Sequence, residues 1–255
     1  MLRSIKALIG YPIRGTDDTV GKVKDFLFDD EKWGIRYMVA DTGGWLSSKK
    51  VLVSPRFLDA PETGGDEKDF PVKLSKEQIE DDPLLEACEP VSRQFEKEYA
   101  RFHNHGYYWG DKGLWGVGMY PIGTLRQTPS PAEVEDHNVA VAEIEESHVR
   151  SASEVIGYHI VATDGEIGHV EDMILDTSMW RIRYLIIDTR NWLPGKKVLV
   201  DIDWLRGFDW ATNTADIAMA KDQIKDAPAF DPKFPVNRDY EEQLYDFYGR
   251  PRYWK

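Results

Sequence analysis

The sequence lacks the features that mark several common classes of protein. Its single cysteine, Cys88, excludes an intramolecular disulfide and fits a reducing cytoplasm. No hydrophobic run approaches the roughly 20 apolar residues of a membrane-spanning helix. The short apolar run that ends at Pro12 is followed by no signal-peptide cleavage site. We therefore expect a cytoplasmic protein without membrane insertion.

Basic residues are scarce relative to acidic ones. The 255 residues include 32 lysines and arginines against 45 aspartates and glutamates, so the formal net charge at pH 7 is −13. Nonspecific nucleic-acid binding depends on cationic side chains that neutralise phosphates. The charge balance therefore argues against nucleic-acid partners and disfavours association with RNA or the ribosome.

What the sequence does contain is a long duplication. Residues 8–58 align with residues 155–205 without a gap, and 24 of the 51 aligned pairs are identical. After a shift of two residues the match resumes at an offset of 145 and continues to Tyr108-Trp109 and Tyr253-Trp254. Each copy spans roughly 105 residues, an ordinary size for a domain. The duplication therefore predicts two homologous domains and excludes a solenoid of short repeats.

Short apolar runs alternate with turn residues within each copy. Turns recur about every eight to twelve residues, a spacing typical of a small all-β barrel or sandwich. The predicted strands of the first copy are residues 8–14, 20–28, 35–40, 49–53 and 72–74. Residues 59–69 and their counterpart RGFDWATNTAD, residues 206–216, are predicted to be polar hairpin loops.

Helical signals follow the strands. Ser75 and Gln78 have the pattern of a capping box, which predicts one helical turn that ends at Pro83. Apolar residues at helical spacing predict a second helix over residues 93–103, and over residues 238–248 in the second copy. We expect the aromatic tail after each of these helices to fold back on its own barrel.

The duplication divides the chain into three parts. Residues 1–110 form the first repeat with its C-terminal helix, and residues 151–255 form the second repeat with its own. Residues 111–150 have no counterpart after the second copy. They combine a stretch rich in glycine and aromatic residues with an acidic stretch that has the composition of a linker.

Four motifs of the second copy lie between residues 157 and 199: Gly-Tyr-x-Ile, Asp-Gly-x-Ile-Gly-x-Val-x-Asp, Trp-x-Ile-Arg-Tyr and Trp-Leu-Pro-Gly-Lys-Lys-Val-Leu. They resemble the PRC-barrel family, whose barrel occurs in the cytoplasmic part of the photosynthetic reaction-centre H subunit and in ribosome maturation proteins. The resemblance implies a mainly β fold, with two tandem small PRC-type β-barrels, each followed by short helices and an aromatic tail. It also implies binding of other macromolecules, and no general catalytic residue.

These observations lead to two hypotheses about function. The first is a non-enzymatic soluble scaffold or adaptor that binds protein partners through its duplicated barrels, with a homo-oligomer left open. The alternative is an accessory or assembly factor of a photosynthetic or electron-transport membrane complex, similar to the reaction-centre H subunit. Such a factor would associate with the membrane complex peripherally.

One repeated motif combines aromatic and basic residues. WLSSKKVLV at residues 45–53 aligns with WLPGKKVLV at residues 192–200. Tryptophan side chains dominate the energetics of many interfaces, and the lysines could contact an acidic partner. The competing interpretations are aromatic residues that close the barrel end and lysines paired with nearby carboxylates. The candidate partner-binding residues are Trp45, Lys49, Lys50, Trp192, Lys196 and Lys197.

Asp25 and Asp172 lie between apolar residues of equivalent predicted strands. A raised pKa would suit a general base or a metal ligand, but we favour structural carboxylates that accept backbone N–H bonds at a turn or bulge. No histidine is shared by the two copies, so a metal site of the repeated module is not expected. His103 and His105, near Cys88, leave open a site in the first copy. We predict no catalytic residue, metal or cofactor.

Overall fold

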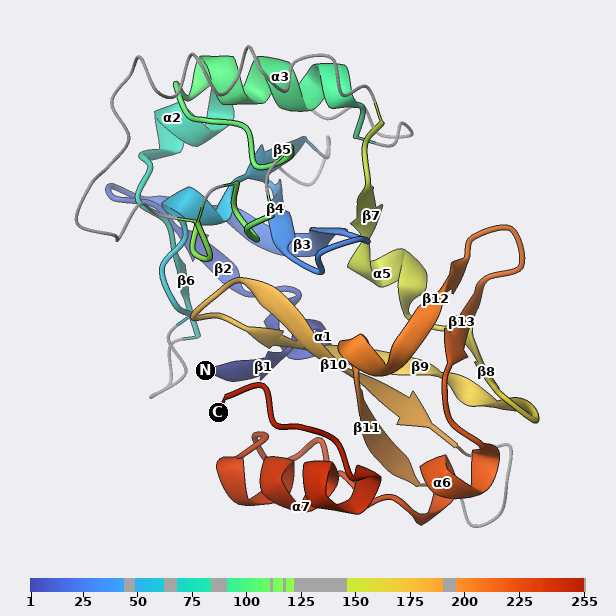
Figure 1. Cartoon of the computed structure of the whole chain (residues 1–255). Helices are drawn as coiled ribbons and strands as arrows, with labels where there is room; N and C mark the ends of the chain where they lie inside the picture. Colours follow the sequence, from blue (N-terminus) through green and yellow to red (C-terminus); the bar gives the residue numbers. More distant parts are fainter. Residues whose placement is uncertain are drawn as a thin grey trace. The chain divides into compact units, whose positions relative to one another are not determined.

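The computed structural model describes residues 1–43, 49–61, 68–83, 91–110, 112–116, 118–121, 146–189 and 196–254 (Figure 1). The chain forms two compact units, each built on one β-sheet. The unit here called the N-terminal unit comprises Leu8–Ser151 and Ser178–Arg181. The C-terminal unit comprises Met1–Ala7, Ala152–Thr177 and Ile182–Lys255. The mainly β fold with two homologous domains is confirmed.

The N-terminal unit contains a six-stranded sheet in the order β5-β4-β3-β2-β6, with β7 paired to β3. Its strands are β2 (Pro12–Arg14), β3 (Thr19–Asp29), β4 (Ile35–Asp41), β5 (Lys50–Val53), β6 (Phe70–Pro71) and β7 (Val149–Ser151). The first predicted strand, residues 8–14, is shorter than expected because Leu8 ends the helix α1 (Ile5–Leu8) and a turn with Gly10 at a φ of +85° precedes β2. The strand predicted over residues 72–74 lies slightly earlier, as β6.

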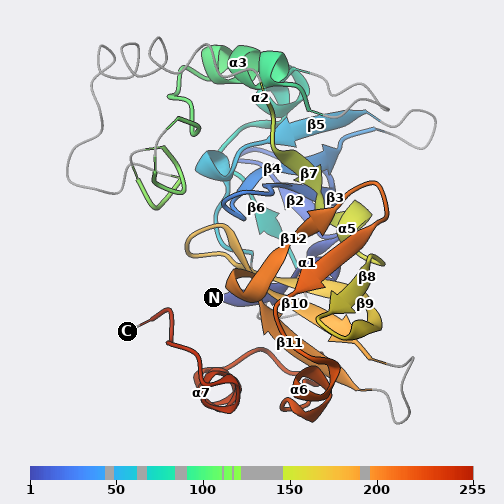
Figure 2. The same ribbon diagram turned by 45° about the vertical axis from the view of Figure 1, so that its right-hand side comes forward.

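The C-terminal unit contains a seven-stranded sheet in the order β11-β10-β9-β8-β13-β12, with β1 paired to β9. Its strands are β1 (Leu2–Ser4), β8 (His159–Ala162), β9 (Gly165–Asp176), β10 (Arg181–Asp188), β11 (Lys197–Asp201), β12 (Leu205–Asp209) and β13 (Thr214–Ile217). β8 and β13 run parallel, side by side (Figure 2). β10 is buried along nearly its whole length, as its continuous apolar run predicts.

Short helices follow the strands in both units. The capping box predicted from Ser75 and Gln78 is confirmed at the start of α2 (Lys76–Glu80). The two longer predicted helices are confirmed as α3 (Arg93–Phe102) and α7 (Arg238–Tyr248). The remaining helices are η1 (Pro55–Phe57), α5 (Ala152–Val155), η2 (Ile202–Trp204) and α6 (Lys221–Asp226). No helix among the described residues has both the length and the apolar character needed to cross a membrane.

The segment RGFDWATNTAD, residues 206–216, forms a hairpin as predicted, but most of it is paired strand and only its tip is a loop. β12 and β13 pair antiparallel through it, from Leu205 opposite Ile217 to Asp209 opposite Thr214. The Asp209 carboxylate accepts the N–H groups of Ala211 and Thr212 and so closes the turn. The polar composition reflects the exposed turn and the edge strand β12, whereas β13 is paired on both sides and buries Ala215 and Ile217.

Two strands lie in the unit formed by the other repeat. β1 begins the first repeat but pairs antiparallel with β9, so residues 1–7 belong to the C-terminal unit. β7 lies at the start of the second repeat but pairs antiparallel with β3 in the N-terminal unit. The compact units therefore differ from the consecutive ranges 1–110 and 151–255, because each sheet is completed by a strand from elsewhere in the chain.

Candidate interaction site

The repeated lysine motif is described only in part. Trp45 and Trp192 lie outside the described residues. The first lysine of each pair reaches the end of a short helix: Lys49 Nζ donates to the Glu80 carbonyl at 2.5 Å and Lys196 Nζ to the Ala227 carbonyl at 2.5 Å. Basic side chains at helix C-termini satisfy carbonyls that have no partner within the helix.

The second lysine of each pair begins an edge strand, β5 or β11. Lys50 is half-buried at the start of β5. Lys197 Nζ lies 2.9 Å from a carboxylate oxygen of Glu171. The shared contact with a helix end accounts for the repetition of Lys49 and Lys196. The Glu171 contact of Lys197 belongs to the second copy alone, and the role of the four lysines in partner binding stays a prediction.

Asp25 follows a β-bulge in β3 and is 9% exposed. Its carboxylate accepts the Phe26 N–H at 2.8 Å and the Ser151 hydroxyl at 2.6 Å. Ser151 is the last residue of β7, the strand supplied from outside the first repeat. This carboxylate therefore fastens β7 to β3.

Asp172 makes the equivalent contacts in β9. It accepts the Met173 N–H at 2.7 Å, the Lys6 N–H at 3.1 Å and the hydroxyl of Ser4. Burial raises the pKa of Asp172, whereas these hydrogen bonds act to lower it. Both duplicated aspartates bind the serine that ends the strand received by their unit, Ser4 of β1 or Ser151 of β7.

A buried polar network connects the sheet of the N-terminal unit to α3 and the aromatic tail. The Arg36 guanidinium lies 2.9 Å from Asp29 and 3.8 Å from the ring centre of Tyr108. The Tyr108 hydroxyl donates to the buried Glu96, which also binds Arg93 at 2.7 Å. Burial raises the pKa of Glu96, while Arg93 acts to lower it.

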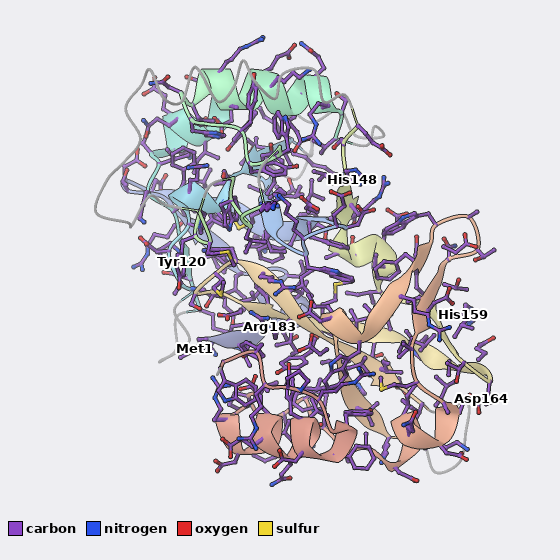
Figure 3. All side chains as sticks on the ribbon, viewed as in Figure 1. Met1, Tyr120, His148, His159, Asp164 and Arg183 are labelled. Carbon is purple, nitrogen blue, oxygen red and sulfur yellow. The ribbon has the colours of Figure 1, made fainter. Side chains whose placement is uncertain are left out.

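The same network recurs in the C-terminal unit. The Arg183 guanidinium, on β10 (Figure 3), lies 3.9 Å from the ring centre of Tyr253. The Tyr253 hydroxyl donates to Glu241 at 2.8 Å, and Tyr184 donates to the same oxygen at 2.7 Å. Arg238 pairs with Glu241 at 3.1 Å. The expectation that each aromatic tail folds back on its own barrel is confirmed.

These networks were not predicted from the sequence, although the residues that form them are repeated. Glu96 and Glu241 occupy the same position of the repeat, and so do Arg93 and Arg238. Charged residues on a helix ordinarily indicate a solvent-exposed face. Here the aromatic tail covers the glutamate of each helix and buries it. Cation–π contacts of such desolvated guanidinium groups stabilise a fold by about 2 kcal/mol.

Three potential metal ligands converge at one place in the C-terminal unit. His169, Glu171 and Asp188 each offer one ligand atom, and these atoms lie within 4.8 Å of one another. However, Glu171 already pairs with Lys197 at 2.9 Å and with Lys6 at 3.5 Å. The hydrogen bond from Lys197 lowers the pKa of Glu171. A cation would compete with two ammonium groups, so the cluster is best described as a salt-bridge network.

The first repeat alone carries a buried imidazole cluster. His103 Nε2 lies 2.7 Å from Asp82, and the ring of His103 stacks parallel to that of His105 with centres 6.3 Å apart. His105 Nε2 is sealed from solvent and has no hydrogen-bond partner among the described residues. Burial, assisted by the nearby Arg56, lowers the pKa of His105 to about 3. The third group considered with these histidines, Cys88, lies outside the described residues.

One duplicated aromatic residue is exposed in both units. Phe102, at the end of α3, is 55% exposed, and its counterpart Phe247 in α7 is 43% exposed. By contrast, Tyr108 and Trp109 of the same repeat are 7% and 6% exposed. The helical spacing of Phe102 and Phe247 suggests a place in the core, but the structure puts them on the surface. Because the exposure recurs at equivalent positions of both repeats, we treat Phe102 and Phe247 as candidate interaction residues.

Comparisons with known proteins agree with the duplication. A model of the PRC-barrel domain matches residues 2–78 and 147–222, which together make up more than half of the chain. Both ranges include the strand that is supplied to the other unit. A protein of Deinococcus radiodurans, described as uncharacterized, is 37% identical over 71 residues, or 28% of this chain and 24% of that protein. The match thus spans about a quarter of that relative's length.

Proposed function

Because the chain belongs to the PRC-barrel family, we propose that it is a non-enzymatic adaptor that binds other proteins. The observation that carries the proposal is the pair of exposed phenylalanines, Phe102 and Phe247, at the same position of both repeats. A large apolar side chain in water is unfavourable by about 1.5–3 kcal/mol relative to its buried state. Its repetition at an exposed position favours a surface that a partner covers.

The residues around these phenylalanines indicate which side chains a partner would present. Phe102 follows the exposed Arg101, whereas Phe247 follows the exposed Asp246. Each ring also contacts the next aromatic residue along the chain, His103 or Tyr248, edge to face at 5.0 Å. The two surfaces thus share an aromatic pair and differ in flanking charge. Both surfaces would suit a partner that presents an apolar or aromatic side chain flanked by charged residues.

The duplicated polar residues support a binding protein over an enzyme. Asp25, Asp172, Glu96 and Glu241 are buried and bonded to groups of the protein itself. A general base must reach a substrate proton, and these carboxylates are committed to structural hydrogen bonds. The alternative of an accessory factor for a membrane complex stays a prediction, as does a cytoplasmic location.

Affinity capture from the native organism tests the proposal. A double variant, Phe102→Asp with Phe247→Asp, is expected to lose most captured protein, because a buried apolar contact becomes a charge. Gln94→Asp with Gln243→Asp is the matched control, because these exposed residues lie on the same two helices. Equal capture by both double variants, with unchanged thermal unfolding, would exclude the phenylalanine surfaces as the binding site.

A further inference from the structure

Residues 1–7 are bound by the C-terminal unit as a peptide would be. Leu2, Arg3 and Ser4 lie opposite Asp176, Leu175 and Ile174 in antiparallel register. Beyond the strand, the Met1 carbonyl accepts the Thr177 N–H at 3.0 Å and the Thr177 hydroxyl at 3.1 Å. Ile5 follows the strand and is 1% exposed. Main-chain pairing combined with a buried side chain is the usual way in which a sheet edge binds an extended segment.

Charge and hydrogen bonds make this binding site selective for the segment it holds. The Asp172 carboxylate accepts both the Ser4 hydroxyl and the Lys6 N–H. Glu171, the preceding residue, lies 3.5 Å from the Lys6 ammonium. Two adjacent carboxylates on β9 thus bind a serine side chain and, two residues later, a lysine side chain. The site is complementary to this chain's own sequence.

The connection from this segment to the N-terminal unit is short. Residues 1–7 belong to the C-terminal unit, whereas the Gly10 N–H already donates to the Val23 carbonyl of β3 at 2.8 Å. Gly10 has a φ of +85°, a left-handed conformation that glycine adopts without steric cost. No atom lies within 4 Å of the position that a Cβ would occupy there. Leu8 is 1% exposed and stays packed, so a change of chain direction is confined to Ile9 and Gly10.

We propose that the β9 site also binds residues 1–7 of a second copy of this chain, so that two molecules exchange these segments and form a dimer. The contacts of β1 with Asp172, Glu171 and Thr177 would be the same in either arrangement, because donors and acceptors are identical. Only the connection through Gly10 must adopt new dihedral angles. Exchange of an identical element is a low-cost route to a dimer, and a strand of three residues opens readily.

The proposal goes beyond partner binding at Phe102 and Phe247 and stands independently of it. A second copy is favoured over an unrelated peptide because the site already matches the Ser4 and Lys6 pattern of this chain. A stretch of three paired residues gives little affinity by itself. The carboxylate contacts supply the selectivity that a foreign peptide would have to reproduce.

Disulfide trapping in the full-length protein tests the exchange. Two chains are prepared in which Cys88 is replaced by serine; one carries Leu2→Cys and the other Asp176→Cys, at positions that face each other in the β1–β9 pair. Directly opposed residues of antiparallel strands lie about 4.5–5.5 Å apart between Cα atoms, which a disulfide can span. After mixing at high concentration and oxidation, covalent dimers of one chain of each kind are expected to exceed dimers of like chains at least tenfold.

A chain that carries both Leu2→Cys and Asp176→Cys serves as the positive control and is expected to close an intrachain disulfide at low concentration. If it closes while the mixed chains stay monomeric, or if like and unlike dimers form equally, the exchange is excluded. If it does not close, the β1–β9 pairing itself is wrong, and so is the proposal. Asp172→Ala in the acceptor chain is expected to reduce unlike dimers several-fold, whereas Asp25→Ala leaves their yield unchanged.

Discussion

The two repeats have kept one buried network and have diverged at the helix end beside it. Arg36 with Glu96, and Arg183 with Glu241, occupy equivalent positions and hold equivalent aromatic tails. Beyond them, the first repeat buries an ionisable pair, His103 with Asp82. The residue equivalent to His103 is Tyr248, which lies 4.8 Å from Trp204 between ring centres.

The residues kept in both copies are those on which the fold depends, whereas the residues that differ occupy space that several side chains can fill. A desolvated arginine between aromatic rings and a carboxylate needs every partner in place, so the set changes little between copies. The space beside the helix end accepts either an imidazole–carboxylate pair or two aromatic rings. The salt bridges of β9 also differ between the copies, because the position of Glu171 is Lys24 in the first copy.

The largest expected effect comes from removing Arg36. Arg36→Ala leaves Asp29 buried without its guanidinium partner and should lower the free energy of unfolding by about 3–5 kcal/mol. Arg183→Ala should cost about 1 kcal/mol less, because Arg36 also donates to the Leu114 carbonyl at 2.6 Å, in a segment that the second repeat lacks. Urea unfolding followed by tryptophan fluorescence measures both, with the exposed Arg206→Ala as control. Equal losses would show that residues 112–116 add no stability.

Removal of the two duplicated aspartates tests whether the received strands are held equally. Asp25→Ala and Asp172→Ala each leave buried donors unsatisfied, so each should lower the free energy of unfolding by about 1–3 kcal/mol. Hydrogen exchange should show faster exchange of β7 in the first variant and of β1 in the second. If either variant changed protein capture without changing hydrogen exchange, the aspartates would have a binding role and would not serve to hold the strands.

A pH titration distinguishes the repeats through His105, whose position is Arg250 in the second copy. The pKa of His105 is about 3 in the folded chain against 6.5 when unperturbed. The unfolded chain therefore takes up a proton below pH 6.5 that the folded chain refuses, so stability falls as pH drops from 6.5 towards 3. His105→Gln should make this fall shallower by up to about 1.4 kcal/mol per pH unit.

The exposed, non-titratable Gln243→Asn is the control for this titration and should leave the slope of stability against pH as it is. Thermal unfolding between pH 7 and pH 4 supplies the measurement. A slope in His105→Gln as steep as in the parent protein would mean that His105 is protonated in the folded state and that its site admits solvent.

The smallest effect is expected at the lysine contacts of β9. Glu171→Gln removes half-exposed pairs with Lys6 and Lys197 and should lower stability by less than about 1 kcal/mol, with a loss that disappears in 1 M salt. Lys24→Gln, at the equivalent position, is the matched variant. If zinc raised the melting temperature of the parent protein but not of Glu171→Gln, the cluster with His169 and Asp188 would be a metal site after all.

Much of the fold follows from local sequence signals. The strands, the capping box at Ser75 and the helices α3 and α7 depend on neighbouring residues, and the duplication places each of them twice. β1 and β7 escape prediction because three residues give no periodicity and their partners are far away in sequence. One signal was present: Arg3-Ser4 repeats as Arg150-Ser151 at the offset of 147.

The candidate sites were less predictable, because burial of a charge is a property of the whole fold. Nothing near Glu96 or Arg93 in sequence shows that an aromatic tail covers them. Likewise, helical spacing places Phe102 beside Tyr99 and does not reveal which of the two faces water. Lys49 and Lys196 look like surface charges until the helix ends that they bind are located.

The supply of β1 and β7 to each other's units has a consequence for what a protease can achieve. A single cut between residues 110 and 146 would leave β1 on one fragment and the sheet that holds it on the other, and the reverse for β7. The two fragments would still be joined by both strand pairs, and they would separate only when β1 and β7 opened together. The same holds for deletions in the gene: a gene that lost either half would encode a sheet with one strand missing.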